Sequence, residues 1–133
     1  MNIQELKTEH QSRFDNLIRD CQIFFAFSQK QFDDNKPELK DGDKYVSIGA
    51  GGYMIKSQVD NYRNGVDEIE KWYTEEIKKN DLKEQEILYE LSDHECFYTG
   101  DIESAVNVLP NYTAQEVYDV YVKYRNDPRY EQS

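Results

Sequence analysis

Apolar side chains recur at intervals of three and four residues over the first 32 positions of the chain. This spacing predicts an amphipathic helix from Asn2 to about Asn35, which Pro37 would end. Residues 23–27 are apolar on every side, so this run is either the buried middle of the helix or a short buried strand, and we favour the helix. The stripe comprises Ile3, Leu6, Phe14, Leu17, Ile18, Cys21, Phe24, Phe25 and Phe32.

The pattern changes between residues 36 and 56. Asp41-Gly42-Asp43 has the composition of a turn, and residues 44–48 have strand propensity. Residues 49–52 are rich in glycine, and residues 53–55 have the composition of a returning strand. We therefore predict a small β-hairpin over residues 44–55.

A second helical stripe follows the hairpin. Ser57 with Asp60 resembles a helix-capping box, and apolar residues then recur to about residue 79. At Asn80 and Asp81 the helix either breaks and restarts or runs on to residue 92, and the pattern is compatible with both. The stripe comprises Val59, Tyr62, Val66, Ile69, Tyr73 and Ile77.

Two shorter helices are expected after residue 100. Asp101 precedes a short apolar pattern that Pro110 ends, and Thr113 with Glu116 forms a capping box before a last helix. Together these elements predict a mainly α (α+β) fold in one domain, residues 1–133. It consists of two long antiparallel helices with a small β-hairpin between them, and two shorter C-terminal helices. The aromatic stripe of the long helices needs cover, so we also expect a homo-oligomer.

Charge is distributed very unevenly along the chain. The net charge is −11, but residues 1–57 carry 9 acids against 8 bases, whereas residues 58–133 carry 18 acids against 8 bases. No Lys or Arg occurs from Glu84 to Val122. Such a surface repels phosphate and attracts basic proteins, so we expect a host protein with a basic surface as partner and no direct contact with nucleic acid. The acidic surface assigned to this partner comprises Glu84, Glu86, Glu90, Asp93, Glu95, Asp101 and Glu103.

Cysteine content and hydropathy indicate the cellular compartment of the protein. Cys21 and Cys96 are the only cysteines, too few for a disulfide framework, which fits a reducing compartment. The N-terminus has no secretory pattern, and no apolar stretch approaches the roughly 18 residues that span a bilayer. We therefore expect a cytoplasmic protein without a membrane contact.

The motifs that suggest catalysis or metal binding are all incomplete. The glycines before Lys56 do not form a phosphate loop, because Ile55 stands where that motif requires glycine. His94 and Cys96 are zinc-ligand types, but a structural zinc site needs four ligands. The acidic neighbourhood would also raise the pKa of a Cys96 nucleophile. We expect no catalytic residue, no metal and no cofactor.

A small-molecule site is the alternative to a protein partner. The glycine turn and the aromatic side chains near it would form a pocket between helices, as in an oligomeric, sponge-like binding protein. Its candidate residues are Tyr45, Gly49, Gly51, Gly52, Tyr53, Arg63 and Trp72.

Two segments, residues 94–103 and residues 48–53, carry a resemblance to a known group of proteins. His94-Glu95-Cys96-Phe97-Tyr98-Thr99-Gly100-Asp101-Ile102-Glu103 and Ile48-Gly49-Ala50-Gly51-Gly52-Tyr53 resemble an uncharacterised family of short acidic proteins encoded by bacteriophages and mobile elements of gut-type bacteria. The resemblance implies a phage or mobile-element origin. It implies no activity, cofactor or catalytic residue.

These observations lead to one preferred function and two alternatives. We expect a non-enzymatic acidic binding protein that blocks or modulates a host protein, as an anti-defence or nucleic-acid-mimic inhibitor would. The alternatives are the small-molecule-binding oligomer and an enzyme with no recognisable motif.

Overall fold

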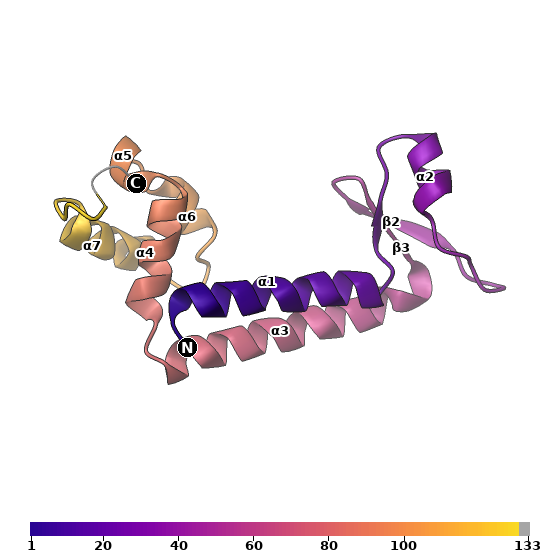
Figure 1. The fold of residues 1–133 in the computed structure, drawn as a ribbon, viewed down its shortest axis with the longest axis horizontal. Coiled ribbons are helices and arrows are strands. Elements are labelled where there is room, and N and C mark those ends of the chain that lie inside the picture. The colour runs from indigo at the N-terminus through magenta and orange to yellow at the C-terminus, as the bar shows by residue number, and fades with distance from the viewer. Residues whose placement is uncertain (131–133) are drawn as a thin grey trace. The chain divides into compact units, whose positions relative to one another are not determined.

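The structure is a computed structural model that describes residues 1–130. It is mainly α-helical with one small antiparallel sheet, as the sequence predicted. The elements are α1 Ile3–Asp20, β1 Phe24–Phe25, α2 Gln29–Asn35, β2 Tyr45–Gly49, β3 Gly52–Ile55, the 3-10 turn η1 Lys56–Gln58, α3 Val59–Lys79, α4 Lys83–Asp93, α5 Cys96–Thr99, α6 Glu103–Asn107 and α7 Ala114–Tyr124 (Figure 1).

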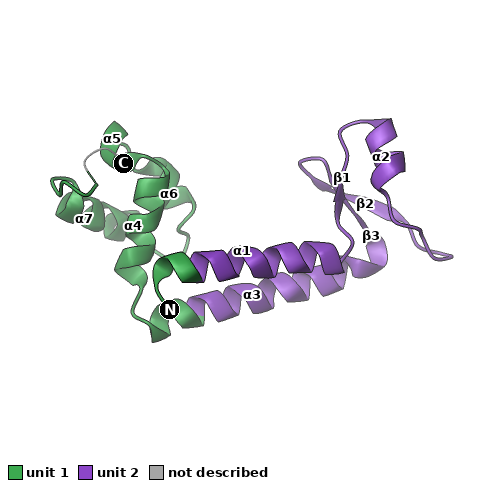
Figure 2. Ribbon diagram, in the orientation of Figure 1, with its two compact units in different colours: residues 1–5, 75–133 green, residues 6–74 purple. Residues whose placement is uncertain are grey.

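The chain divides into two compact units (Figure 2). Unit 2 is residues 6–74, and unit 1 is residues 1–5 together with the chain from residue 75 onward. Unit 2 holds most of α1 and α3, the sheet and α2. Unit 1 holds α4 to α7. The folding of residues 1–133 as a single domain stays a prediction.

The single helix predicted from Asn2 to about Asn35 is wrong, because α1 ends at Asp20 and residues 24–25 form β1. The helix ends in a Schellman motif, with Gln22 in the left-handed conformation at φ 55°. The amide of Gln22 donates to the Arg19 carbonyl and the amide of Ile23 donates to the Ile18 carbonyl. A glycine normally occupies this left-handed position, so the glutamine gave no sign of a helix end.

The same motif resolves the alternative left open at Asn80 and Asp81. Asp81 is left-handed at φ 52°, and the amide of Leu82 donates to the Ile77 carbonyl. The α3 helix therefore stops at Lys79, and α4 begins as a separate helix. The chain thus leaves two helices at left-handed residues, Gln22 and Asp81, that are neither glycine nor asparagine.

In unit 2, α1 lies antiparallel to the facing part of α3. His10 contacts Tyr73, Arg13 contacts Trp72, and Leu17 lies against Gly65, so the partner number falls as the α1 number rises. A Cβ atom on Gly65 would lie 2.4 Å from Leu17 Cδ1. The glycine therefore allows the two helices to approach closely at this point.

The predicted hairpin is present and is part of a three-stranded sheet in the order β1, β3, β2. Phe24 of β1 pairs with Tyr53 of β3, so the 23–27 run supplies an edge strand. The rings of Phe24, Phe32, Tyr45 and Tyr53 pack with centroids 5.1 to 5.7 Å apart. We call these four rings the aromatic cluster. They give the small sheet the apolar cover that a two-residue edge strand lacks.

The start of α3 differs from the prediction at Ser57. The expected capping box with Asp60 is wrong, because Ser57 lies in η1 and its hydroxyl donates to the Asp43 carboxylate. Asp43 also accepts a hydrogen bond from the Lys44 amide. These contacts hold the Asp41-Gly42-Asp43 turn against the beginning of the helix.

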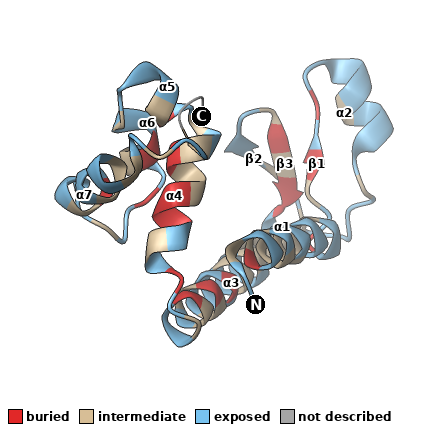
Figure 3. Cartoon of the chain, turned by 60° about the vertical axis from the view of Figure 1, so that its left-hand side comes forward, coloured by how far each residue is buried: buried red, intermediate tan, exposed pale blue. Residues whose placement is uncertain are grey.

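Unit 1 is a helical bundle around one apolar core (Figure 3). The predicted capping box at Thr113 and Glu116 is confirmed, with each side chain accepting from the other residue's amide. The Asp101 carboxylate accepts from the Glu103 amide at the start of α6. One cysteine is buried in each unit, Cys21 in unit 2 and Cys96 in unit 1. The unit 1 core comprises Ile87, Leu91, Cys96, Ala105, Leu109 and Val117.

Over residues 1–130, none of the helices combines the length and the apolar character that crossing a bilayer requires.

The hairpin turn generates a first prediction. Gly51 is left-handed at φ +77°, and a Cβ atom there would lie 2.3 Å from Phe27 Cε1; Gly42, at φ +83°, has open space instead. Gly42→Ala should lower the free energy of unfolding by about 1 kcal/mol, the cost of the left-handed backbone alone. Gly51→Ala should cost more, because the Phe27 ring must also move. Urea unfolding of both variants measures the difference.

The Phe27→Ala background is the control for this comparison. In that background the two glycine substitutions should lower the free energy of unfolding by similar amounts, because the Phe27 ring that contacts only Gly51 is absent. An unchanged gap between the two glycine substitutions would show that the Phe27 contact is not its cause.

Candidate functional site

Three of the seven acids assigned to the partner surface are held by other side chains of unit 1. Glu84 accepts a hydrogen bond from the Tyr124 hydroxyl, and Lys123 Nζ lies 3.2 Å from both of its carboxylate oxygens. The Tyr124 hydrogen bond and then the Lys123 ammonium lower the pKa of Glu84. The charge of Glu84 is thus compensated by a base 39 residues away in sequence.

Glu86 is the second and is buried, with only 6% of its surface exposed. Its carboxyl group accepts a hydrogen bond from the Tyr112 hydroxyl at 2.5 Å. Burial, followed by the hydrogen bond to Glu86, raises the pKa of Tyr112. Glu86 is therefore part of the core of unit 1 and does not offer its charge to a partner.

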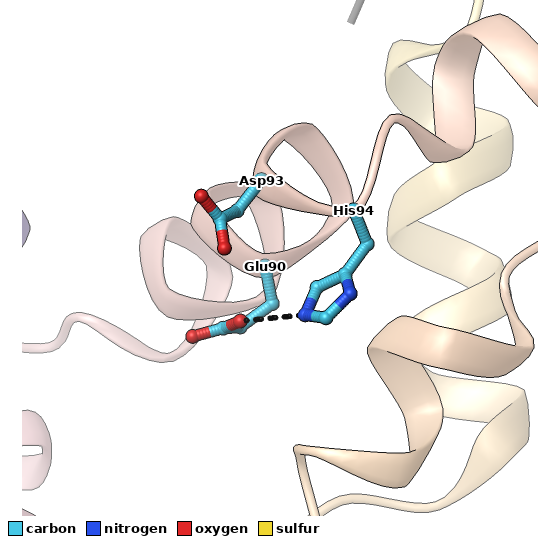
Figure 4. A group of neighbouring side chains, drawn as sticks. All are labelled: Glu90, Asp93 and His94. Atoms are coloured by element: carbon cyan, nitrogen blue, oxygen red, sulfur yellow. Dashed lines mark ion pairs between the residues drawn. The ribbon is translucent and has the colours of Figure 1, made fainter.

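Glu90 is the third and lies beside His94, with Glu90 Oε2 3.4 Å from His94 Nε2. Asp93 brings a third ligand-type group to the same place, since the three side chains offer oxygen and nitrogen atoms that all lie within 4.8 Å of one another (Figure 4). The zinc-type motif in the sequence pairs His94 with Cys96 and does not include Glu90. The spacing of Glu90, Asp93 and His94 by three and four residues along a helix was the available signal.

The other four acids are exposed and follow one another around α5. Asp93 ends α4, Glu95 precedes α5, Asp101 follows it and Glu103 begins α6. Within residues 1–130, no Lys or Arg side chain forms an ion pair with any of these four. Tyr98 on α5 is 75% exposed between them. We call Asp93, Glu95, Tyr98, Asp101 and Glu103 the acidic segment.

Glu116, outside the predicted surface, is also compensated. It forms an ion pair with Lys83, which is 33 residues away. The Lys83 ammonium and then the Thr113 amide lower the pKa of Glu116 to about 2. The carboxylate thus joins α4 to the start of α7.

The candidate ligand residues do not converge on one pocket. Tyr45 and Tyr53 belong to the aromatic cluster, and the Tyr45 hydroxyl donates to the Pro37 carbonyl. Trp72 instead stacks under Arg13, whose guanidinium lies 3.7 Å from the ring centroid. Arg63 is exposed and nine residues before Trp72, which places the two on opposite faces of α3.

The glycines of this set form the hairpin turn, as their composition indicated. Gly49 and Gly51 are both left-handed, and Gly52 pairs with Phe25 in the sheet. The Phe27 ring lies over Gly51. A hollow of about 450 Å³ adjoins the aromatic cluster. It is lined by Ala26, Phe27, Ser28, Gln29, Phe32 and Tyr53.

Cys96 is a core residue in the structure. It is fully buried, its thiol lies 4.0 Å from the His94 carbonyl oxygen, and burial raises its pKa. A buried thiol with a raised pKa forms little thiolate, so Cys96 has none of the features of a reactive nucleophile.

Comparison with known proteins places the chain in a family. A model described as a family of unknown function (DUF7659) matches residues 2–126. The chain belongs to the DUF7659 family. Neither a curated protein nor a solved structure is significantly similar to the chain. Membership in DUF7659 covers both units, and no activity comes with it.

The buried pair gives the second prediction. Tyr112→Phe removes the hydrogen bond to Glu86 and should lower the free energy of unfolding by about 2 kcal/mol, because the acceptor is a buried carboxyl group. Tyr118→Phe is the matched control on α7, since Tyr118 is exposed. Thermal and urea unfolding measure both. Equal effects of the two substitutions would contradict the structural role of the pair.

The Glu116 carboxylate gives the third prediction, on acid stability. Its pKa is about 2 in the folded protein against an ordinary value of 4.5, so its contribution is present above pH 4.5 and is lost as the pH falls toward 2. Wild type should therefore be more stable than Glu116→Gln at pH 6, and the gap should close toward pH 2. Denaturant unfolding across this range measures the gap. A gap that is independent of pH would rule out the charge as its cause.

Proposed function

We propose that the protein is a non-enzymatic binding protein of phage or mobile-element type that blocks or modulates a host protein through the acidic segment. The observation that carries the proposal is the set of four exposed carboxylates around the exposed Tyr98 ring, with no Lys or Arg ion pair to them over residues 1–130. Glu84, which pairs with Lys123, and Glu86, which accepts a hydrogen bond from Tyr112, serve unit 1 itself.

The chemistry of the acidic segment suits a basic partner. Adjacent carboxylates repel one another, and a lysine- or arginine-rich surface relieves that repulsion while it accelerates encounter. A tyrosine among the charges adds apolar area and a hydroxyl, and tyrosine is enriched among the residues that dominate interface energies. The two properties together favour a protein partner over a small ion.

Mimicry of nucleic acid is the specific form of inhibition that we propose. A host protein that handles DNA or RNA binds phosphates with Lys and Arg side chains, and exposed carboxylates occupy the same groups. The resemblance to proteins of bacteriophages and mobile elements supports this choice, because blocking a host nuclease or defence protein benefits such an element.

Small-molecule binding remains the second candidate. The hollow of about 450 Å³ beside Phe27, Phe32 and Tyr53 favours it, since ligand pockets combine aromatic walls with a few polar groups. Of the seven predicted ligand residues only Tyr53 lines this hollow; the other six lie outside its lining.

Self-association also stays a proposal. The stripe that motivated it includes Ile69 and Tyr73, which are already buried in the single chain. A second copy would therefore contact other surfaces of the protein than these two residues.

The fourth prediction compares two variants of equal charge. Glu95→Gln, Asp101→Asn and Glu103→Gln together remove three of the four charges of the acidic segment, while asparagine at 101 can still accept the hydrogen bond from the Glu103 amide. Asp60→Asn, Asp67→Asn and Glu68→Gln neutralise three exposed acids of α3 instead. We expect the first variant to capture less of a bacterial-lysate partner and to associate with it at least tenfold more slowly at low salt. The α3 variant should behave as wild type.

Affinity capture with each of the three proteins, followed by association kinetics with the captured partner at rising salt, measures these effects. The rate for wild type should fall with salt, and the rate for the segment variant should vary less. A duplex that competes with the protein for the partner would support mimicry. Equal slowing in both variants would refute the acidic segment as the interface and leave only a general effect of net charge.

A further inference from the structure

We infer that Glu90, Asp93 and His94 form a binding site for one divalent transition-metal ion of the zinc type. The site shares Asp93 with the acidic segment, but it goes beyond the proposed function, because it binds an ion and needs no protein partner. The three residues lie at the C-terminal end of α4, and their ligand atoms are all within 4.8 Å of one another. Figure 4 shows the three side chains in one group at this end of the helix.

Helix geometry explains why the three groups meet. Asp93 is three residues and His94 four residues beyond Glu90, and side chains at these spacings are neighbours on a helix surface. A histidine four residues from another ligand is the spacing by which helices hold zinc in other proteins. The ion pair between Glu90 and His94 already orients two of the ligands before any metal arrives.

The observed separation fits a shared ion. Zinc ligands lie about 2.0 to 2.1 Å from the metal in a tetrahedral arrangement, so two of them are about 3.3 Å apart. His94 Nε2 and Glu90 Oε2 are 3.4 Å apart, which needs little rearrangement. Rotation of the exposed Asp93 side chain brings in the third ligand.

The chemistry of the site favours a divalent cation. One imidazole and two carboxylates suit zinc and its neighbours in the first transition row, whereas calcium and magnesium prefer oxygen ligands alone. The C-terminal end of a helix carries partial negative charge, and the last turn of α4 has no basic residue to compete with a cation.

Partial burial and the number of ligands distinguish this cluster from an ordinary surface ion pair. The side chain of Glu90 is 12% exposed and that of His94 is 28% exposed, so both are partly fixed by packing while the site stays open to solvent through Asp93. Three protein ligands leave a fourth position for water or a partner's side chain. The other histidine, His10, meets a single carboxylate at Glu70.

Calorimetric titration of the chelator-treated full chain with zinc chloride tests the site. We expect one zinc per chain in wild type, with affinity at least tenfold weaker in His94→Asn and in Asp93→Asn. Two matched controls should bind zinc with an affinity within about twofold of wild type. His10→Asn removes the other imidazole, and Glu103→Gln removes one exposed carboxylate from the acidic segment. Circular dichroism checks that each variant folds. Asp93 is exposed, so its replacement should leave the fold intact.

Cobalt titration supplies the second readout. Visible absorption of bound cobalt should appear in wild type and disappear in both ligand variants, with no thiolate band from Cys96. Absence of zinc binding, retention of wild-type affinity in either ligand variant, or equal weakening in the controls would overturn the site. Because none of these measurements involves a protein partner, their failure would leave the proposed function standing, and failure of the capture experiment would leave the metal site standing.

Discussion

Three residues in the left-handed backbone conformation determine where the helices end, and the rest of the fold depends on them. Gln22, Asp81 and Glu95 all have φ between 52° and 56°. For a residue with a Cβ atom, this left-handed conformation is about 1 kcal/mol or more less favourable than the right-handed one. At each position the chain leaves a helix and changes direction. The edge strand β1, the separate helix α4 and the short helix α5 each follow one of these turns.

Long-range charge pairs separate the acids of unit 1 into two groups. Lys83 and Lys123 reach Glu116 and Glu84 across 33 and 39 residues and so connect α4 with α7. The acids between residues 93 and 103 have no such partner among residues 1–130. The acids that pair with lysines therefore stabilise the contact between α4 and α7, whereas the acids of residues 93–103 leave uncompensated negative charge at the surface. A run without bases in the sequence does not imply a surface without bases in the fold.

The elements that could be predicted from sequence are those with local signals. The hairpin and the Thr113 capping box were evident from nearby residues, whereas the pattern near residue 80 allowed both a helix break and a continuous helix. The end of α1 was not evident, because glutamine at position 22 gives no local sign of a left-handed turn. The 23–27 run was ambiguous in itself, and pairing with Tyr53 decided it as strand.

The candidate site was predictable only in part, for the same reason. Composition identified the acids around α5, but the contacts of Glu84 and Glu86 depend on residues 26 to 40 positions away. Arg63 and Trp72 were grouped by chemistry, although a nine-residue interval sends them to opposite sides of α3. Helical spacing brings Glu90, Asp93 and His94 together at the end of α4, whereas no metal motif in the sequence contains all three.

The two buried thiols give each unit its own internal reporter. Cys21 belongs to unit 2 and Cys96 to unit 1, and both side chains are shielded from solvent. A thiol-specific reagent reacts with them only when the surrounding structure opens. Labelling rates at the two positions therefore measure the opening of each unit separately, within one unmodified chain. Equal rates would mean that the units open as one cooperative structure, and unequal rates would mean that one can loosen while the other stays closed.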